Sequence, residues 1–191
     1  MSYAMEQGPR QHRITVDEYH RMAEVGLLAP DARVELIEGV IVDMAPIGSP
    51  HCAVVDLLNK LFTHGVKDDA IVRTGGAVRL SRWTEPQPDI ALLEPREDYY
   101  RHAHPGGSDL LLIVEVSDSS LRYDLDTKSK LYARYGVQEF WVVDVNEDVM
   151  HFFRQRTDVG YADVSSTDRP GTVPIPSLGV SIDLSELFEP R

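Results

Sequence analysis

Residues 110–116, Leu-Leu-Leu-Ile-Val-Glu-Val, form a continuous apolar run that is interrupted only by Glu115. A run of this length, rich in branched aliphatic side chains, predicts a strand that is buried on both faces of a sheet. Glu115 would then carry a carboxylate in the interior, which is costly unless it is paired, hydrogen-bonded or bound to a metal. The sequence near Glu115 must therefore supply a partner.

A helical pattern follows at residues 123–135, after the capping residues 117–120 and before Gly136. On a helical wheel, one arc of roughly 120° holds a set of residues that includes a lysine. They are Asp124, Leu125, Lys128, Leu131, Tyr132 and Tyr135. Lys128 is therefore predicted to face inward, whereas Lys130 and Arg134 face water. The alternative is a surface pair between Asp124 and Lys128, with Glu115 capping the helix.

A second acid, Asp89, stands at the start of a predicted strand that opens with proline, at residues 86–93. Two acids at the ends of neighbouring strands, with a lysine, are typical of a magnesium site, because Mg²⁺ uses one or two carboxylates plus waters and phosphates. Such a cation activates a water and stabilises charge on a phosphodiester. The alternative is that Asp89 is a turn residue after Pro88.

Several further segments match a known family in the expected order, from residue 15 to residue 188. They are residues 33–39, 49–51 (Ser-Pro-His), 87–89 (Gln-Pro-Asp), 114–117 (Val-Glu-Val-Ser), Asp124-x3-Lys128-x3-Tyr132, 135–144 and 175–188. With these segments the chain resembles the Uma-type restriction endonucleases, within the PD-(D/E)xK nuclease superfamily. Each segment is weak alone, and the ordered set is specific.

The resemblance implies an α/β (α+β) fold, a restriction-endonuclease-like mixed central sheet flanked by helices. It implies that Asp89 and Glu115 bind Mg²⁺, or Mn²⁺ as an alternative, and that Lys128 is the catalytic lysine of a DNA endonuclease. The wider superfamily has its lysine two residues after the glutamate, where this chain has Ser117. The family instead places a lysine on the following helix, in agreement with the wheel.

Three accessory residues complete the expected site. Glu35 matches an extra acid of the superfamily, with an exposed hairpin residue as the alternative. His51, at the start of a predicted helix, is a candidate for contact with substrate or a metal-bound water, with a structural role as the alternative. Asp124 is a candidate for orienting Lys128.

The chain has 191 residues, which predicts one domain at 14–191 after a polar tail at 1–13. No apolar run approaches the length of a membrane span and the tail lacks a signal-peptide core, so we expect a cytoplasmic protein without a membrane partner. Its 19 Lys and Arg against 31 Asp and Glu give a net charge of −12. We therefore expect weak affinity for nucleic acid.

The acidic balance also keeps a second function open, a catalytically weak member of the family that serves as a binding or assembly module. We further expect a homodimer, because nucleases that cut both strands often pair two sites and closed twofold symmetry is common. Phe152 and Phe153 point to opposite faces of a predicted strand, so one of them could belong to the partner surface.

The remaining pattern predicts the other elements. We expect helices at 15–25, 49–64, 123–135 and 184–188, and strands at 33–37, 40–44, 71–74, 77–80, 89–94, 110–116, 139–145, 149–154 and 161–164.

Overall fold

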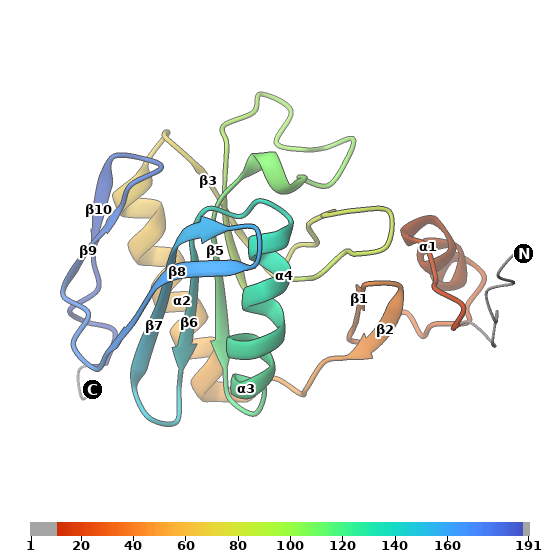
Figure 1. Ribbon diagram of the computed structural model, residues 1–191, viewed down its shortest axis with the longest axis horizontal. Helices are drawn as coiled ribbons and strands as arrows, with labels where there is room; N and C mark the ends of the chain where they lie inside the picture. The colour runs from red at the N-terminus through yellow and green to blue at the C-terminus, as the bar shows by residue number, and fades with distance from the viewer. Residues whose placement is uncertain (1–10, 189–191) are drawn as a thin grey trace, which may run out of the picture.

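A six-stranded mixed sheet forms the centre of the molecule, which we describe from a computed structural model for residues 11–188. The strand order is β3-β4-β5-β6-β7-β8, and only the β5–β6 pair is parallel. The strands are β3 (Ile71–Thr74), β4 (Ile90–Leu93), β5 (Leu110–Ser117), β6 (Phe140–Asp144), β7 (Val149–Thr157) and β8 (Gly160–Thr167). The predicted mixed sheet flanked by helices is confirmed (Figure 1).

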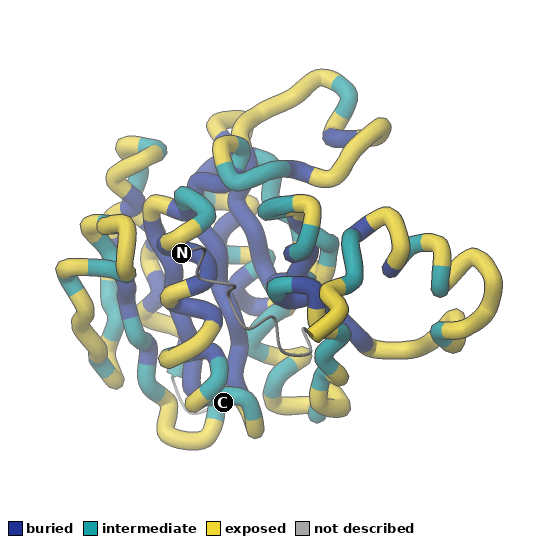
Figure 2. The backbone as a smooth tube through the Cα atoms, turned by 45° about the vertical axis from the view of Figure 1, so that its right-hand side comes forward, coloured by how far each residue is buried: buried dark blue, intermediate teal, exposed yellow. Residues whose placement is uncertain are grey.

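Helices cover both faces of this sheet. Helix α2 (Ser49–Val66) lies on one face, and the helical segment of α3 (Leu121–Tyr123), a π-helical turn (Asp124–Lys128) and α4 (Ser129–Arg134) lies on the other (Figure 1). Each face has its own apolar core, one around Phe62 and Trp141 and one around Tyr132 and Phe140. The central strands are accordingly buried, as predicted for a strand covered on both sides (Figure 2).

An N-terminal unit lies beside the sheet (Figure 1). It contains helix α1 (Val16–Glu24), which begins with a capping box between Thr15 and Glu18, and the antiparallel hairpin of β1 (Val34–Ile37) and β2 (Val40–Asp43). Leu36 pairs with Glu85 through backbone hydrogen bonds, so the hairpin is joined to the segment that leads into β4. This junction brings β1 towards the ends of the central strands.

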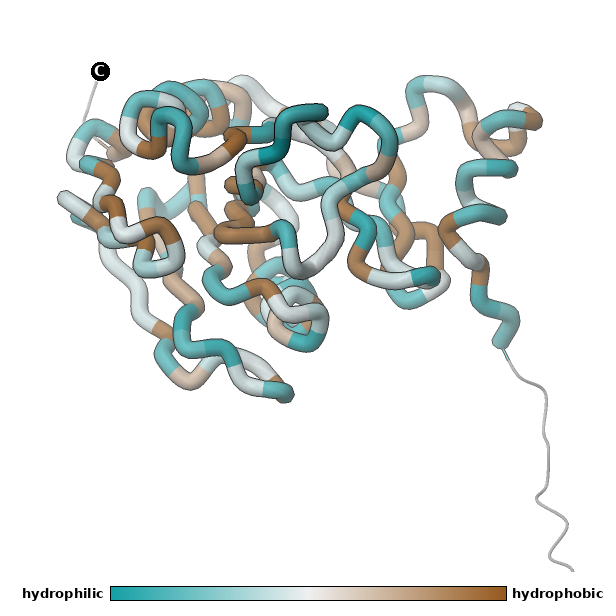
Figure 3. Tube along the Cα trace, turned by 90° about the horizontal axis from the view of Figure 1, so that it is seen from above, coloured by the Kyte–Doolittle hydropathy of each residue, from teal (hydrophilic) through white to brown (hydrophobic). Residues whose placement is uncertain are grey.

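At the other end, β9 (Thr172–Ile175) and β10 (Val180–Asp183) form a second hairpin. Ile182 from this hairpin lies so close to Gly65 of α2 that a side chain at that glycine would collide with it. The hairpin thereby extends the apolar core beneath α2. Figure 3 shows short hydrophobic stretches separated by hydrophilic ones along the described chain.

Three predictions about these elements are wrong. Residues 77–80 form no strand, because their backbone groups bond to the loop at 84–86 and to Pro105 instead of to a neighbouring strand. Residues 184–188 form turns, as expected for a segment too short to nucleate a helix. Phe152 and Phe153 are both buried within the chain, one in each core, so neither supplies a partner surface.

Most of the predicted tail at 1–13 lies outside the described residues, as do the last three residues of the predicted domain. Within residues 11–188, no helix is both long enough and apolar enough to cross a membrane.

Candidate active site

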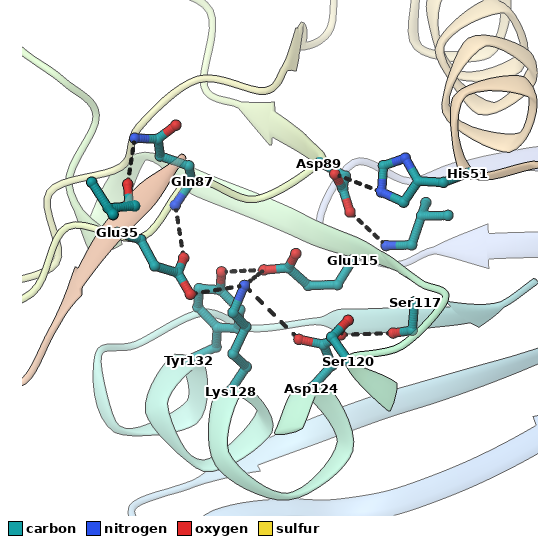
Figure 4. A network of polar contacts seen from close by, with 12 residues as sticks. Glu35, His51, Gln87, Asp89, Glu115, Ser117, Ser120, Asp124, Lys128 and Tyr132 are labelled. Carbon is teal, nitrogen blue, oxygen red and sulfur yellow. Dashed lines mark hydrogen bonds and ion pairs between the residues drawn. The ribbon is translucent and has the colours of Figure 1, made fainter. Parts of the chain in front are cut away.

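A pocket of about 280 Å³ opens where the carboxyl end of β5 meets the start of β4. The β1–β2 hairpin, the start of α2 and the helical segment at 121–128 form its other walls. Its lining contains every residue that the sequence predicted for the site: Glu35, His51, Asp89, Glu115, Asp124 and Lys128. The structure thus brings together side chains from five separate segments of the chain (Figure 4).

Asp89 stands just before β4, and Glu115 lies on the neighbouring strand β5. Strands β4 and β5 pair antiparallel with Ile90 opposite Val114, so the residue before Ile90 falls opposite the residue after Val114. The backbone N–H of Val116 donates to Asp89 Oδ2 at 2.8 Å, which fixes that carboxylate against β5.

Lys128 lies inside the pocket and is only 5% exposed. Its Nζ donates to Glu115 Oε1 at 3.0 Å and lies 3.4 Å from Glu35 Oε1 and 3.9 Å from Asp124 Oδ1 (Figure 4). Lys130 is exposed, as the wheel predicts. Asp124 and Lys128 do approach each other, but both are buried, so they are not a surface pair.

The helix that carries Lys128 is not a regular α-helix. Residues Asp124–Lys128 form a π-helical turn between α3 and α4. Four residues span about one turn in either geometry, which is why Asp124 and Lys128 still share the inner face. Turns of this kind recur at functional sites. This turn carries Asp124 and Lys128, the two polar site residues that the helical segment supplies.

Three residues that sequence reasoning did not assign to the site hold its carboxylates in place. The hydroxyls of Ser117 and Ser120 donate to Asp124 Oδ2 at 2.7 and 2.6 Å, instead of capping the helix. The Tyr132 hydroxyl donates to Glu115 Oε1 at 2.6 Å. The signal for Tyr132 in the sequence was its spacing, four residues after Lys128 on the same inward arc.

The accessory residues Glu35 and His51 also reach the pocket. Glu35 is 2% exposed and its Oε2 accepts a hydrogen bond from the backbone N–H of Gln87 at 3.3 Å, so it is not an exposed hairpin residue. His51 Nε2 lies 3.1 Å from Asp89 Oδ1. The other ring nitrogen of His51, Nδ1, is buried without a hydrogen-bond partner among the described residues.

The pocket gathers more negative than positive charge. Burial raises the pKa of Glu115 to about 8; Lys128 opposes this shift, while Asp124, Asp89 and Glu35 add to it. Burial alone would lower the pKa of Lys128, but the carboxylates of Glu115, Glu35 and Asp124 outweigh it and raise that pKa above its ordinary value. Lys128 therefore stays charged at neutral pH.

The donor chemistry of this pocket fits a hard divalent cation. The carboxylates of Glu35, Glu115 and Asp124 lie within 3.9 Å of the Lys128 ammonium group, and Asp89 lines the same pocket. Among the described residues, both side-chain hydrogen bonds to Glu115 fall on Oε1, which leaves Oε2 available for a cation. In the described part of the chain, no group of three or more His, Cys, Asp and Glu side chains could hold a metal ion by itself. Mg²⁺ needs only one or two protein carboxylates, with water completing its shell.

Comparison with known proteins identifies the family of the chain and a solved structure with a similar fold. The family model Uma2, described as "Putative restriction endonuclease", matches residues 16–185. A crystal structure from Anabaena variabilis, described as "a putative nuclease belonging to DUF820", is similar at 21% identity and a TM-score of 0.68, covering 92% of this chain and 97% of that one. No curated protein matches the chain significantly.

Proposed function

Because the chain belongs to the Uma2 restriction endonuclease family, we propose that it is a magnesium-dependent endonuclease that hydrolyses phosphodiester bonds of DNA. The observation that carries the proposal is the convergence of Asp89, Glu115 and Lys128 in one buried, acidic pocket. A buried lysine among carboxylates has little value for folding stability, because the desolvation of such charges offsets much of their attraction. Its presence is better explained by chemistry at the pocket.

In this proposal Asp89 and Glu115 hold the cation. When bound, the cation supplies positive charge to the phosphate oxygens and lowers the pKa of a bound water. Asp89 is oriented for this role by Val116 N–H and His51, and Glu115 by Tyr132 and Lys128.

Lys128 acts as a charged hydrogen-bond donor. Its raised pKa makes it a poor general base at neutral pH, so its ammonium group stabilises negative charge that develops on the phosphate or orients the attacking water. Glu35 and Asp124 flank Lys128 Nζ and keep it charged, and Ser117 and Ser120 hold Asp124 in turn.

One observation favours a second candidate function, a binding or assembly module with weak catalysis. The chain carries 31 acidic against 19 basic residues, and nucleic-acid binding normally depends on Lys and Arg contacts to phosphate. The homodimer and the cytoplasmic location stay predictions under either function.

The two candidates are separated by a combined binding and cleavage measurement. Mg²⁺ or Mn²⁺ at a hundred times its dissociation constant is expected to stabilise the folded protein by about 2.7 kcal/mol, and so raise its melting temperature. The same cations should start cleavage of DNA that EDTA stops. A rise in melting temperature without any cleavage would favour the module, and no effect of either cation would contradict the metal site.

A further inference from the structure

The pocket has two chemically different halves. One part of its lining consists of the carboxylates and Lys128, whereas the connection between β2 and α2 supplies an apolar wall. This wall, which we call the apolar wall, consists of Met44, Ala45, Pro46 and Ile47. Tyr123, half-buried at the start of the helical segment, also lines the pocket. An apolar wall beside a phosphodiester-cleaving centre suits the flat face of a nucleobase better than a sugar-phosphate backbone.

Positive charge is scarce around this pocket. Among the described residues that line it, only Arg33 and Lys128 are lysine or arginine, and Lys128 is already surrounded by carboxylates. Arg33 holds the apolar wall in place through a hydrogen bond from its guanidinium to the carbonyl oxygen of Ala45. Specific duplex-DNA interfaces bury roughly 1,000–2,500 Å² of strongly positive surface. The lining of this pocket lacks the positive charge of such a surface.

The size of the pocket points in the same direction. Its volume of about 280 Å³ lies just below the range for small-molecule sites, roughly 300–1,000 Å³. A base pair within a stacked duplex cannot enter a pocket of this size, whereas one unstacked nucleotide can. Enzymes that take a base into such a pocket use single-stranded substrate or extrude the nucleotide, because the base must leave the stack to enter.

We propose that the site acts on an unpaired nucleotide, in single-stranded or locally opened nucleic acid, and not on intact duplex. This proposal rests on the proposed nuclease function and names its substrate class. The base stacks on Tyr123 and the apolar wall, and its phosphate reaches the carboxylate end of the pocket, with Arg33 at the rim. Aromatic stacking contributes to single-strand binding beside the contacts that basic residues make with the backbone, and Tyr123 supplies the aromatic part in this pocket.

The test compares one DNA sequence in three forms: a single strand, a full duplex, and a duplex with a central unpaired loop. Binding is measured by fluorescence anisotropy with Ca²⁺ in place of Mg²⁺, and cleavage is mapped with Mg²⁺. We expect the single strand and the loop to bind more tightly than the duplex, with cuts at the unpaired nucleotides.

Two tyrosine variants identify the stacking residue. Tyr123→Ala should weaken single-strand binding by about tenfold, while Tyr123→Phe, which keeps the ring, should bind as the parent does. Tyr99→Ala is the matched control, because Tyr99 is 70% exposed and does not line this pocket. Unchanged melting temperatures exclude loss of folding as the cause.

Each outcome separates the substrate class from the nuclease function. If the duplex is bound and cut as well as the single strand, this inference is overturned, whereas the proposed nuclease function is unaffected. If no form of the DNA is cleaved, but the single strand binds more tightly and this preference depends on Tyr123, the nuclease function is contradicted. The assignment of the pocket to an unpaired nucleotide then stands. Equal binding by the Tyr123→Ala and Tyr99→Ala variants, or no binding of any form, would overturn the inference.

Discussion

Replacing Lys128 with alanine is expected to lower divalent-dependent cleavage by about 10²- to 10⁴-fold, the range for loss of a positioned proton donor or charge stabiliser. Lys128 Nζ lies 3.0 Å from Glu115 Oε1 inside the pocket, so its removal takes the ammonium group away from the reacting phosphate. Initial cleavage rates of the Lys128→Ala variant and the parent protein at saturating Mg²⁺ measure the effect.

Lys130→Ala is the matched control, because Lys130 stands two residues away on the exposed face. We expect it to cleave at nearly the parental rate. Lys128→Ala also removes the ammonium group that lies between the carboxylates of Glu35, Glu115 and Asp124. The melting temperature of this variant should therefore fall in EDTA and recover in part with Mg²⁺. Equal rates for folded Lys128→Ala and Lys130→Ala proteins would contradict the role of Lys128.

Glu115→Gln is expected to lose most of its affinity for Mn²⁺ and nearly all cleavage. The glutamine keeps the shape of the side chain but not the charge that holds the cation. Titration calorimetry should show a dissociation constant raised by at least about tenfold, while Asp126→Asn, at an exposed acid on the helical segment that carries Lys128, should bind as the parent does. Parental affinity in the Glu115→Gln variant would show that the cation binds elsewhere.

The same variant should change how stability depends on pH in EDTA. Burial raises the pKa of Glu115 from its ordinary value of 4.5 to about 8, so between these values the folded state binds more protons than the unfolded state. This contribution to stability is complete below pH 4.5 and is lost as the pH rises to about 8. Glu115→Gln should therefore be more stable than the parent at pH 8 and nearly equal to it at pH 4.5. If chemical denaturation shows the parent to be more stable than Glu115→Gln at pH 8, the result contradicts a destabilised Glu115 carboxylate.

Local sequence pattern was sufficient to predict much of the fold. The apolar run at 110–116 became β5, Thr15 and Glu18 formed the capping box of α1, and the apolar stripe of the 123–135 pattern pointed inward. These features depend on neighbours within one or two turns of the chain, where spacing alone decides which side chains share a face. The position of Lys128 in the pocket follows from the same spacing.

The contacts between distant segments could not be predicted in this way. The burial of Glu35 depends on the loop at Gln87, and the approach of His51 to Asp89 depends on where the start of α2 meets β4. The π-helical turn gives no clear signal in spacing, since a regular helix places the same residues inward. The strand predicted at 77–80 did not form for a similar reason. Its backbone groups bond to the loop at 84–86 and to Pro105, and the local pattern gives no sign of these distant partners.

The most direct test of the account is the anomalous density of Mn²⁺ in crystals soaked at saturating concentration. We predict one peak in the pocket, bound at about 2.1 Å by a carboxylate oxygen from each of Asp89 and Glu115, with water molecules completing its shell. A peak that contacts neither carboxylate, or no peak in the pocket at all, would contradict the metal-dependent site.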